Sequence, residues 1–344
     1  MSFVIDGSEW RFDGLSSVDF ENAVQALMER MERVTARGET LWFGHNFQLR
    51  PMLADRSLWQ LFDEDEKLFL SREIQHELAA QINHLNCYED QHEDQWPPHF
   101  EDMSSIGVGG EKPSENLDVL WAHLSALARR ATGCLGHARA GRIDTQSQHG
   151  AIAVHWVGDA TCHAKFWRDA IELEGDSIRT LERLAPHAYP NLYFPETVWK
   201  GCNDFNGGYY SQSSELRRYL AALDDFGSWI FTASPDDGLV ATGPAAQASA
   251  TVKGAVPASP SDQLVIRRFA QLNLDVVPEK SNVRRDKTSR EAREIEIGEK
   301  VLYCEWHGKL QPHQNRVHIH SPIPESANRL VVAIFTSHLP LPGD

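Results

Sequence analysis

Signatures of membrane insertion and secretion are missing from this sequence of 344 residues. No run approaches the roughly 18 consecutive apolar residues that a membrane-spanning helix needs. The opening residues, MSFVIDGSEW, lack the basic start and the apolar stretch of a signal peptide. Cysteine is scarce and never spaced as CxxC, which argues against a disulfide framework; the five are Cys87, Cys134, Cys162, Cys202 and Cys304. We therefore expect a cytoplasmic protein with no membrane partner.

The familiar nucleotide and hydrolase motifs are also missing. The chain contains no GxxxxGK[ST], no GxGxxG and no GxSxG, so no motif indicates nucleotide hydrolysis or α/β-hydrolase chemistry. With 41% hydrophobic and 24% charged residues, the chain is far from the disordered class. Its length allows two domains, or one large one, with a sizeable core.

A net charge of -16 argues at first against a nucleic-acid partner, because phosphate binding needs a positive surface. The charge is unevenly spread. Residues 1–130 carry 11 Lys+Arg and 24 Asp+Glu, a net of -13, whereas residues 251–344 carry 13 Lys+Arg and 11 Asp+Glu, a net of +2. Local charge decides binding because salt screens beyond roughly 8 Å. The C-terminal end therefore remains open to an RNA partner.

The pattern along the chain predicts an α+β protein. Residues 1–232 mix helical and strand patterns and form the expected sensing or regulatory region. Residues 233–262 are rich in Ala, Gly, Ser, Pro and Thr, which is typical of a flexible linker or loop. Residues 263–344 are expected to form a small antiparallel β-rich effector domain, with strands over 294–297, 301–307, 316–320 and 330–335.

One dense chemical cluster stands out, in residues 303–322, YCEWHGKLQPHQNRVHIHSP. Side chains alternate between the two faces of a strand. If the strands on either side of the turn pair, one face carries Glu305, His307, Lys309, Arg316, His318 and His320. The last strand then delivers His338 just beyond its end.

This cluster suggests proton transfer next to a phosphate. Cleavage of RNA through its 2′-hydroxyl needs a base, an acid and cations that stabilise the phosphorane. His and Glu can transfer protons near neutral pH, and Arg and Lys can hold the phosphate. That route needs no metal and no cofactor. We expect His307 to exchange protons with His318 or His320, Lys309 and Arg316 to hold the phosphate, and Glu305 to orient a histidine.

Three other interpretations stay open. The alternation is also typical of a plain antiparallel sheet with one solvated face. The second interpretation is a metal site, because His318 and His320 could both bind a metal ion, and His307 and Glu305 could complete its coordination shell. The third is a metal-dependent nuclease built on the triplet Glu305–His307–Lys309, with Asp275 or Asp286 as the upstream acid.

The order of these segments resembles the C-terminal sheet of RelE/HigB-like bacterial toxins. A basic segment precedes the strands that carry Trp306-His307, Lys309, Arg316-Val317-His318 and Ser337-His338; it comprises Arg284, Arg285, Lys287, Arg290 and Arg293. The resemblance covers residues 265–344. It implies metal-independent cleavage of mRNA by basic residues on a concave sheet, with the basic segment contacting nucleic acid. The segments 166–177, 181–194 and 304–310 also resemble uncharacterised bacterial proteins.

The acidic segment 87–102, CYEDQHEDQWPPHFED, matches no metal-binding loop, so we expect a solvated loop. Its opposite charge allows a second hypothesis, that it mimics nucleic acid and covers the C-terminal basic face.

The sequence thus predicts a bacterial toxin or anti-phage defence effector acting as a metal-independent endoribonuclease, within a defence or toxin–antitoxin complex. The alternatives are a non-catalytic partner or sensor subunit of such a complex and a metal-dependent nuclease.

Overall fold

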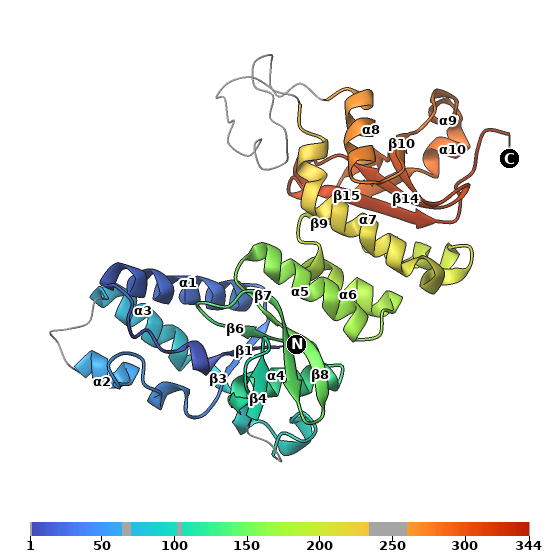
Figure 1. Cartoon of the computed structure of the whole chain (residues 1–344). Helices are drawn as coiled ribbons and strands as arrows, with labels where there is room; N and C mark the ends of the chain where they lie inside the picture. The colour runs from blue at the N-terminus through green and yellow to red at the C-terminus, as the bar shows by residue number, and fades with distance from the viewer. Residues whose placement is uncertain (1, 64–69, 102–104, 234–259, 344) are drawn as a thin grey trace. The chain divides into compact units, whose positions relative to one another are not determined.

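The chain folds into two compact units, residues 1–175 and 176–344, each with its own sheet (Figure 1). The structure is a computed structural model and describes residues 2–63, 70–101, 105–233 and 260–343. The chain combines helices with several sheets, and the α+β class is confirmed. None of the helices in the described ranges has the length and apolar character needed to cross a lipid bilayer.

Unit 1 is built on an eight-stranded mixed sheet in the order β3-β2-β1-β6-β8-β7-β4-β5. The five strands from β3 to β8 are parallel neighbours, and the other three add antiparallel pairs at one edge. The strands are β1 (Ser2–Ile5), β2 (Thr40–Phe43), β3 (Asn86–Cys87), β4 (Ser105–Val108), β5 (Ser114–Glu115), β6 (Thr132–Leu135), β7 (Gly141–Ser147) and β8 (Gly150–Trp156).

Helices cover both faces of this sheet. They are α1 (Ser17–Ala36), α2 (Leu58–Asp63), α3 (Arg72–Asn83), α4 (Leu117–Leu127) and α5 (Ala160–Leu173). Alternation along β1 explains the two layers: Val4 belongs to the core that α4 fills, whereas Phe3 contacts Phe166 and Trp167 of α5. The central parallel strands, β1 and β6, are buried on both sides, as the strands of parallel sheets generally are.

Unit 2 contains a five-stranded sheet in the order β10-β13-β14-β15-β9 and a separate hairpin, β11-β12. Its strands are β9 (Leu192–Tyr193), β10 (Val276–Pro278), β11 (Glu294–Ile297), β12 (Lys300–Tyr303), β13 (Trp306–Gln311), β14 (Gln314–His320) and β15 (Leu330–Thr336). Its helices are α6 (Ile178–Ala188), α7 (Gly208–Ile230), α8 (Asp262–Gln271), α9 (Ser281–Arg285) and α10 (Lys287–Glu291).

The boundary between the units differs from the predicted division at residues 233–262. It falls after Gly175, because α7 packs with β13 and β15, and α6 packs with the short 3-10 helix Val198–Asp204 that lies against β15. Leu330 of β15 lies against Gly227 of α7, and β9 pairs with β15 across more than a hundred residues. Most of the predicted linker, residues 234–259, lies outside the described residues.

Candidate active site

Strands β13 and β14 bring the predicted residues together. They pair antiparallel, with His307 opposite His318 and Lys309 opposite Arg316, so the predicted pairing is confirmed. Residues directly opposite in such a ladder point to the same side of the sheet. The four side chains therefore meet on one face of β13 and β14.

The other face of β13 is fixed by α7. A Cβ at Gly308 would lie 2.7 Å from the ring of Tyr219, so only glycine lets the helix approach this closely. The Tyr219 hydroxyl donates to the carbonyl of Lys309 at 2.8 Å and accepts from the backbone of Asp275 at 2.9 Å. Helix α7 thus holds the backbone of the strand whose opposite face carries His307 and Lys309.

A buried glutamate that the sequence analysis missed lies at the centre of the site. Glu279 directly follows β10, which forms the edge of the sheet beside β13. Its Oε1 lies 3.0 Å from Nδ1 of His307 and 3.7 Å from Nδ1 of His318, and it accepts a 2.8 Å hydrogen bond from Nε of Arg293. The His307 contact has hydrogen-bond length without the alignment of a directed hydrogen bond, and it becomes an ion pair when the imidazole is protonated.

Glu279 is held as a carboxylate. Burial by itself raises the pKa of this group, but the bonds and charges of His307 and Arg293 outweigh burial and lower the pKa to about 2. A carboxylate held beside an imidazole orients the ring.

His318 has a different environment from His307. It is 1% exposed, and burial lowers its pKa to about 3, so its imidazole is neutral at physiological pH. Neither ring nitrogen has a hydrogen-bond partner among the described residues. Buried polar atoms are normally satisfied, so this ring has capacity for a partner from outside the chain.

These groups line a cavity of about 290 Å³. Its walls include His307, Lys309, Arg316 and His318 of the six residues predicted to be catalytic, and Arg293 of the five predicted to bind nucleic acid. The complete lining is Val277, Pro278, Glu279, Lys280, Val283, Arg293, His307, Lys309, Arg316, His318, His338, Leu339 and Leu341. The cavity joins two imidazoles and a carboxylate to a set of cations.

The cationic side chains of the cavity differ in their solvent exposure and in the partners that they already have. Arg316 is 8% exposed and donates to the carbonyls of Gln311 and Gln314, and burial lowers its pKa. Lys309 is more accessible, with its Nζ 3.0 Å from Asp275. Lys280 is exposed and has no ion pair among the residues that the structure describes. The two lysines can turn toward an anion more easily than the arginine.

Two predicted site residues lie outside this cavity. The predicted strand over 301–307 is interrupted at Cys304 and Glu305, because the Cys304 amide bonds to Arg293 and the Glu305 carbonyl to Glu279. Glu305 instead pairs with Arg284 at 3.4 Å. His320 follows a register shift between His318 and Ile319, and its Nδ1 contacts the Ser321 carbonyl. Such a shift re-aims the side chains beyond it.

The predicted nucleic-acid-binding segment is largely neutralised. Arg284 pairs with Glu305, Lys287 with Glu291, Arg290 with Glu294 and Arg293 with Glu279. Arg285 makes no ion pair within the described part of the chain. Arg293 is only 3% exposed and is a structural anchor of Glu279. The segment offers less free positive charge than its sequence indicates.

No protein-family model, no curated protein and no solved structure matches the chain. The site is therefore interpreted from its own geometry.

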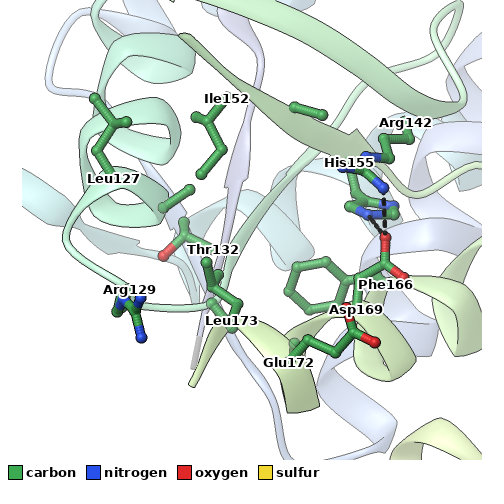
Figure 2. A pocket seen from close by; sticks show the side chains of 14 residues that line it. Leu127, Arg129, Thr132, Arg142, Ile152, His155, Phe166, Asp169, Glu172 and Leu173 are labelled. Atoms are coloured by element: carbon green, nitrogen blue, oxygen red, sulfur yellow. Dashed lines mark hydrogen bonds and ion pairs between the residues drawn. The ribbon is translucent and has the colours of Figure 1, made fainter. Parts of the chain in front are cut away.

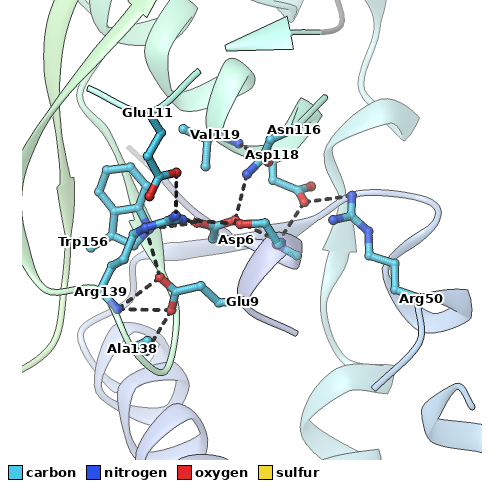
Figure 3. Close-up of polar contacts among 12 residues, drawn as sticks. Asp6, Glu9, Arg50, Glu111, Asn116, Asp118, Val119, Ala138, Arg139 and Trp156 are labelled. Carbon is cyan, nitrogen blue, oxygen red and sulfur yellow. Dashed lines mark hydrogen bonds and ion pairs between the residues drawn. The ribbon is translucent and has the colours of Figure 1, made fainter. Parts of the chain in front are cut away.

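Unit 1 contains a second polar cluster, beyond the carboxyl ends of β1 and β6 (Figure 3). Asp6 accepts from Asn116, Arg139 and Trp156, each at 3.0 Å. Asp118 is bonded by the Gly7 amide and paired with Arg50, while burial raises its pKa to about 6. Every one of these carboxylates already has partners, so the network joins the strand ends rather than presenting an open site.

A third group in unit 1 involves the acidic segment. His45, Cys87 and Glu89 have donor atoms within 4.8 Å of one another, and the Cys87 thiol contacts Glu89 at 3.3 Å. The segment forms short helical turns over Tyr88–Asp90 and Glu93–Gln95. The hypothesis that it covers the basic face stays a prediction.

Proposed function

We propose that unit 2 is a metal-independent endoribonuclease, acting in the cell as a toxin or defence effector. The contact between Glu279 and His307 carries the proposal, since it lies in a cavity lined by lysine and arginine. A carboxylate-supported imidazole beside cations fits cleavage of RNA through its own 2′-hydroxyl. The toxin or defence role rests on the resemblance of residues 265–344 to RelE/HigB-like toxins.

His307 is assigned as the base. With Nδ1–H toward Glu279, Nε2 remains as the acceptor. It takes the proton of the 2′-hydroxyl as that oxygen attacks the phosphorus atom. The bond from phosphorus to the 5′-oxygen then breaks, leaving a 2′,3′-cyclic phosphate and a 5′-hydroxyl end. No oxidant, reductant or metal is needed for this balance.

The acid is reassigned from the sequence prediction. His318 is too buried to reach a leaving group, and its low pKa leaves it without a proton to donate. His338 is exposed and lines the same cavity, so it is the better donor to the 5′-oxygen. His318 lines the cavity as a buried neutral ring, and Lys280 and Lys309 are left to hold the phosphate.

The test is cleavage of a defined single-stranded RNA by the full chain in EDTA. We expect cyclic-phosphate ends, and we expect His307→Ala to reduce the rate by at least about a hundredfold, as for loss of a general base. His320→Ala is the matched control, because that imidazole lies outside the cavity. Cleavage that persists in His307→Ala, or that is lost equally in His320→Ala, would overturn the assignment.

A second candidate is a metal-dependent nuclease. Glu279, His307 and His318 have ligand atoms within 4.8 Å of one another, and two histidines with one carboxylate form a familiar ligand set. Arg293 bonds the same carboxylate and opposes a cation there. Cleavage abolished by EDTA and restored by zinc would favour this candidate. Absence of cleavage and of any growth defect on expression would favour the non-catalytic partner of a defence complex.

A further inference from the structure

A cleft of about 450 Å³ opens in unit 1, between α5 and the sheet (Figure 2). One wall is a single helical face, because Phe166, Asp169, Ala170 and Leu173 recur at helical spacing along α5. The volume lies within the roughly 300–1,000 Å³ of small-molecule sites. The candidate active site of unit 2 does not include this cleft.

The body of the cleft is apolar. Leu127, Ile152, Phe166 and Leu173 contribute large side chains, and small residues such as Ala153 leave the space between them. Figure 2 shows Leu127 and Ile152 on one side and Phe166 and Leu173 on the other. A flat apolar group would be desolvated here.

One end carries a fixed polar arrangement. His155 of β8 lies opposite Arg142 of β7 in the strand register, and both approach the same Asp169 oxygen, at 3.0 and 3.4 Å. Burial raises the pKa of Asp169, but the bond from His155 and the nearby charges outweigh it, so the pKa lies below its usual range. With Nε2 committed to Asp169, the Nδ1 edge of His155 remains for another partner.

Arg129 is the unusual residue of the lining. It follows the end of α4 with a φ of 59°, a left-handed conformation that favours glycine at this position. An arginine there costs about 1 kcal/mol relative to glycine. Its side chain is exposed, and in the part of the chain that the structure describes, its guanidinium makes no ion pair or side-chain hydrogen bond. Glu172, also in the lining, has a contact of its own.

We propose that this cleft binds a small organic anion with a flat apolar body. The anionic group meets Arg129, the body packs between Phe166 and Ile152, and the His155–Asp169 pair supplies a directional hydrogen bond. Unit 1 thereby has a ligand of its own, independent of the reaction proposed for unit 2. Arg129 is an exposed cation with no protein partner among the described residues, and it lies beside an apolar cavity, which is the combination that this ligand class would satisfy.

The experiment is isothermal titration calorimetry of the full chain with naphthalene-2-sulfonate. A second titration uses 2-naphthol as an uncharged probe of similar shape. We expect one sulfonate per chain, bound at least about tenfold more tightly than naphthol, a difference of about 1.4 kcal/mol. Arg129→Gly removes the cation while relieving the backbone strain, so it should fold and bind the sulfonate at least about tenfold more weakly.

Two more variants complete the test. Ala153→Phe should fill the cleft and abolish binding of both probes, while thermal unfolding verifies that it is folded. Lys165→Ala removes an exposed lysine of α5 that does not line the cleft, and it should bind like the unaltered protein. The proposal fails if sulfonate and naphthol bind equally, if Arg129→Gly binds like the unaltered protein, or if neither probe binds at millimolar concentration.

Discussion

At the scale of single residues, burial assigns different roles to two histidines that look equivalent in the sequence. His307 and His318 face each other across the ladder, with ring centroids 5.5 Å apart. His307 keeps a partly exposed ring beside Glu279, whereas His318 is enclosed. In the proposed reaction, proton transfer therefore falls to His307 rather than to His318.

Glu279 gives a prediction about stability. Removing it leaves the buried guanidinium of Arg293 without a carboxylate, so Glu279→Ala should destabilise unit 2 by roughly 3 kcal/mol or more. Glu305→Ala removes an exposed partner of Arg284 and should change stability by less than about 0.5 kcal/mol. Thermal and urea unfolding of the full chain measure both. Equal effects would show that burial does not set the strength of these pairs.

The same residues predict how stability depends on pH. The folded pKa of His318, about 3, is below its ordinary 6.5, so the unfolded chain binds a proton that the folded chain does not. The contribution of His318 to the free energy of unfolding is therefore full above pH 6.5, and it falls as the pH drops toward 3. The pKa of Glu279 is lowered from 4.5 in the unfolded chain to about 2 in the folded chain, so its contribution to stability is lost as the pH falls from 4.5 to 2. Unfolding in EDTA should show both.

His318→Phe separates the two contributions, because phenylalanine has a similar shape and does not titrate. This variant should lose the share of His318 between pH 6.5 and 3 and keep that of Glu279 between pH 4.5 and 2. His123 of unit 1, whose pKa burial lowers from 6.5 to about 4, keeps its own share of the dependence. An unchanged slope between pH 6.5 and 4.5 would place that proton uptake on another group.

At the scale of elements, the contact between α7 and β13 positions the site. Gly308→Ala introduces a methyl group 2.7 Å from Tyr219, which should cost about 1–3 kcal/mol and displace His307 and Lys309 together. Tyr219→Phe keeps the ring but loses the hydrogen bonds of the hydroxyl to β13 and Asp275, which should lower the free energy of unfolding by about 1 kcal/mol. Unfolding and RNA cleavage, measured together, distinguish crowding from lost hydrogen bonds. A Gly308→Ala protein with normal stability and cleavage would contradict this role for α7.

At the scale of the whole molecule, the boundary after Gly175 predicts which fragment folds. A fragment of residues 176–344 should give a cooperative unfolding transition, because it keeps α7 and β9 against the sheet. A fragment of residues 263–344 loses both and exposes the apolar face around Gly308, so it should not fold. Circular dichroism and thermal unfolding of the two fragments test this. A folded 263–344 fragment would restore the boundary predicted from composition.

The sequence by itself determined the faces of β13 and β14 and their alignment, because alternation along a strand is a local property with a period of two residues. It also determined the α+β class and the position of the final apolar strand. Only the tertiary structure brings Glu279 into the site and buries His318. It also leaves Glu305 and His320 outside the cavity. Those outcomes depend on β10 reaching the edge of β13, on the break after β12 and on the register shift in β14. Burial and pairing between distant segments carry no local pattern, so the fold decides which of the aligned side chains form the site.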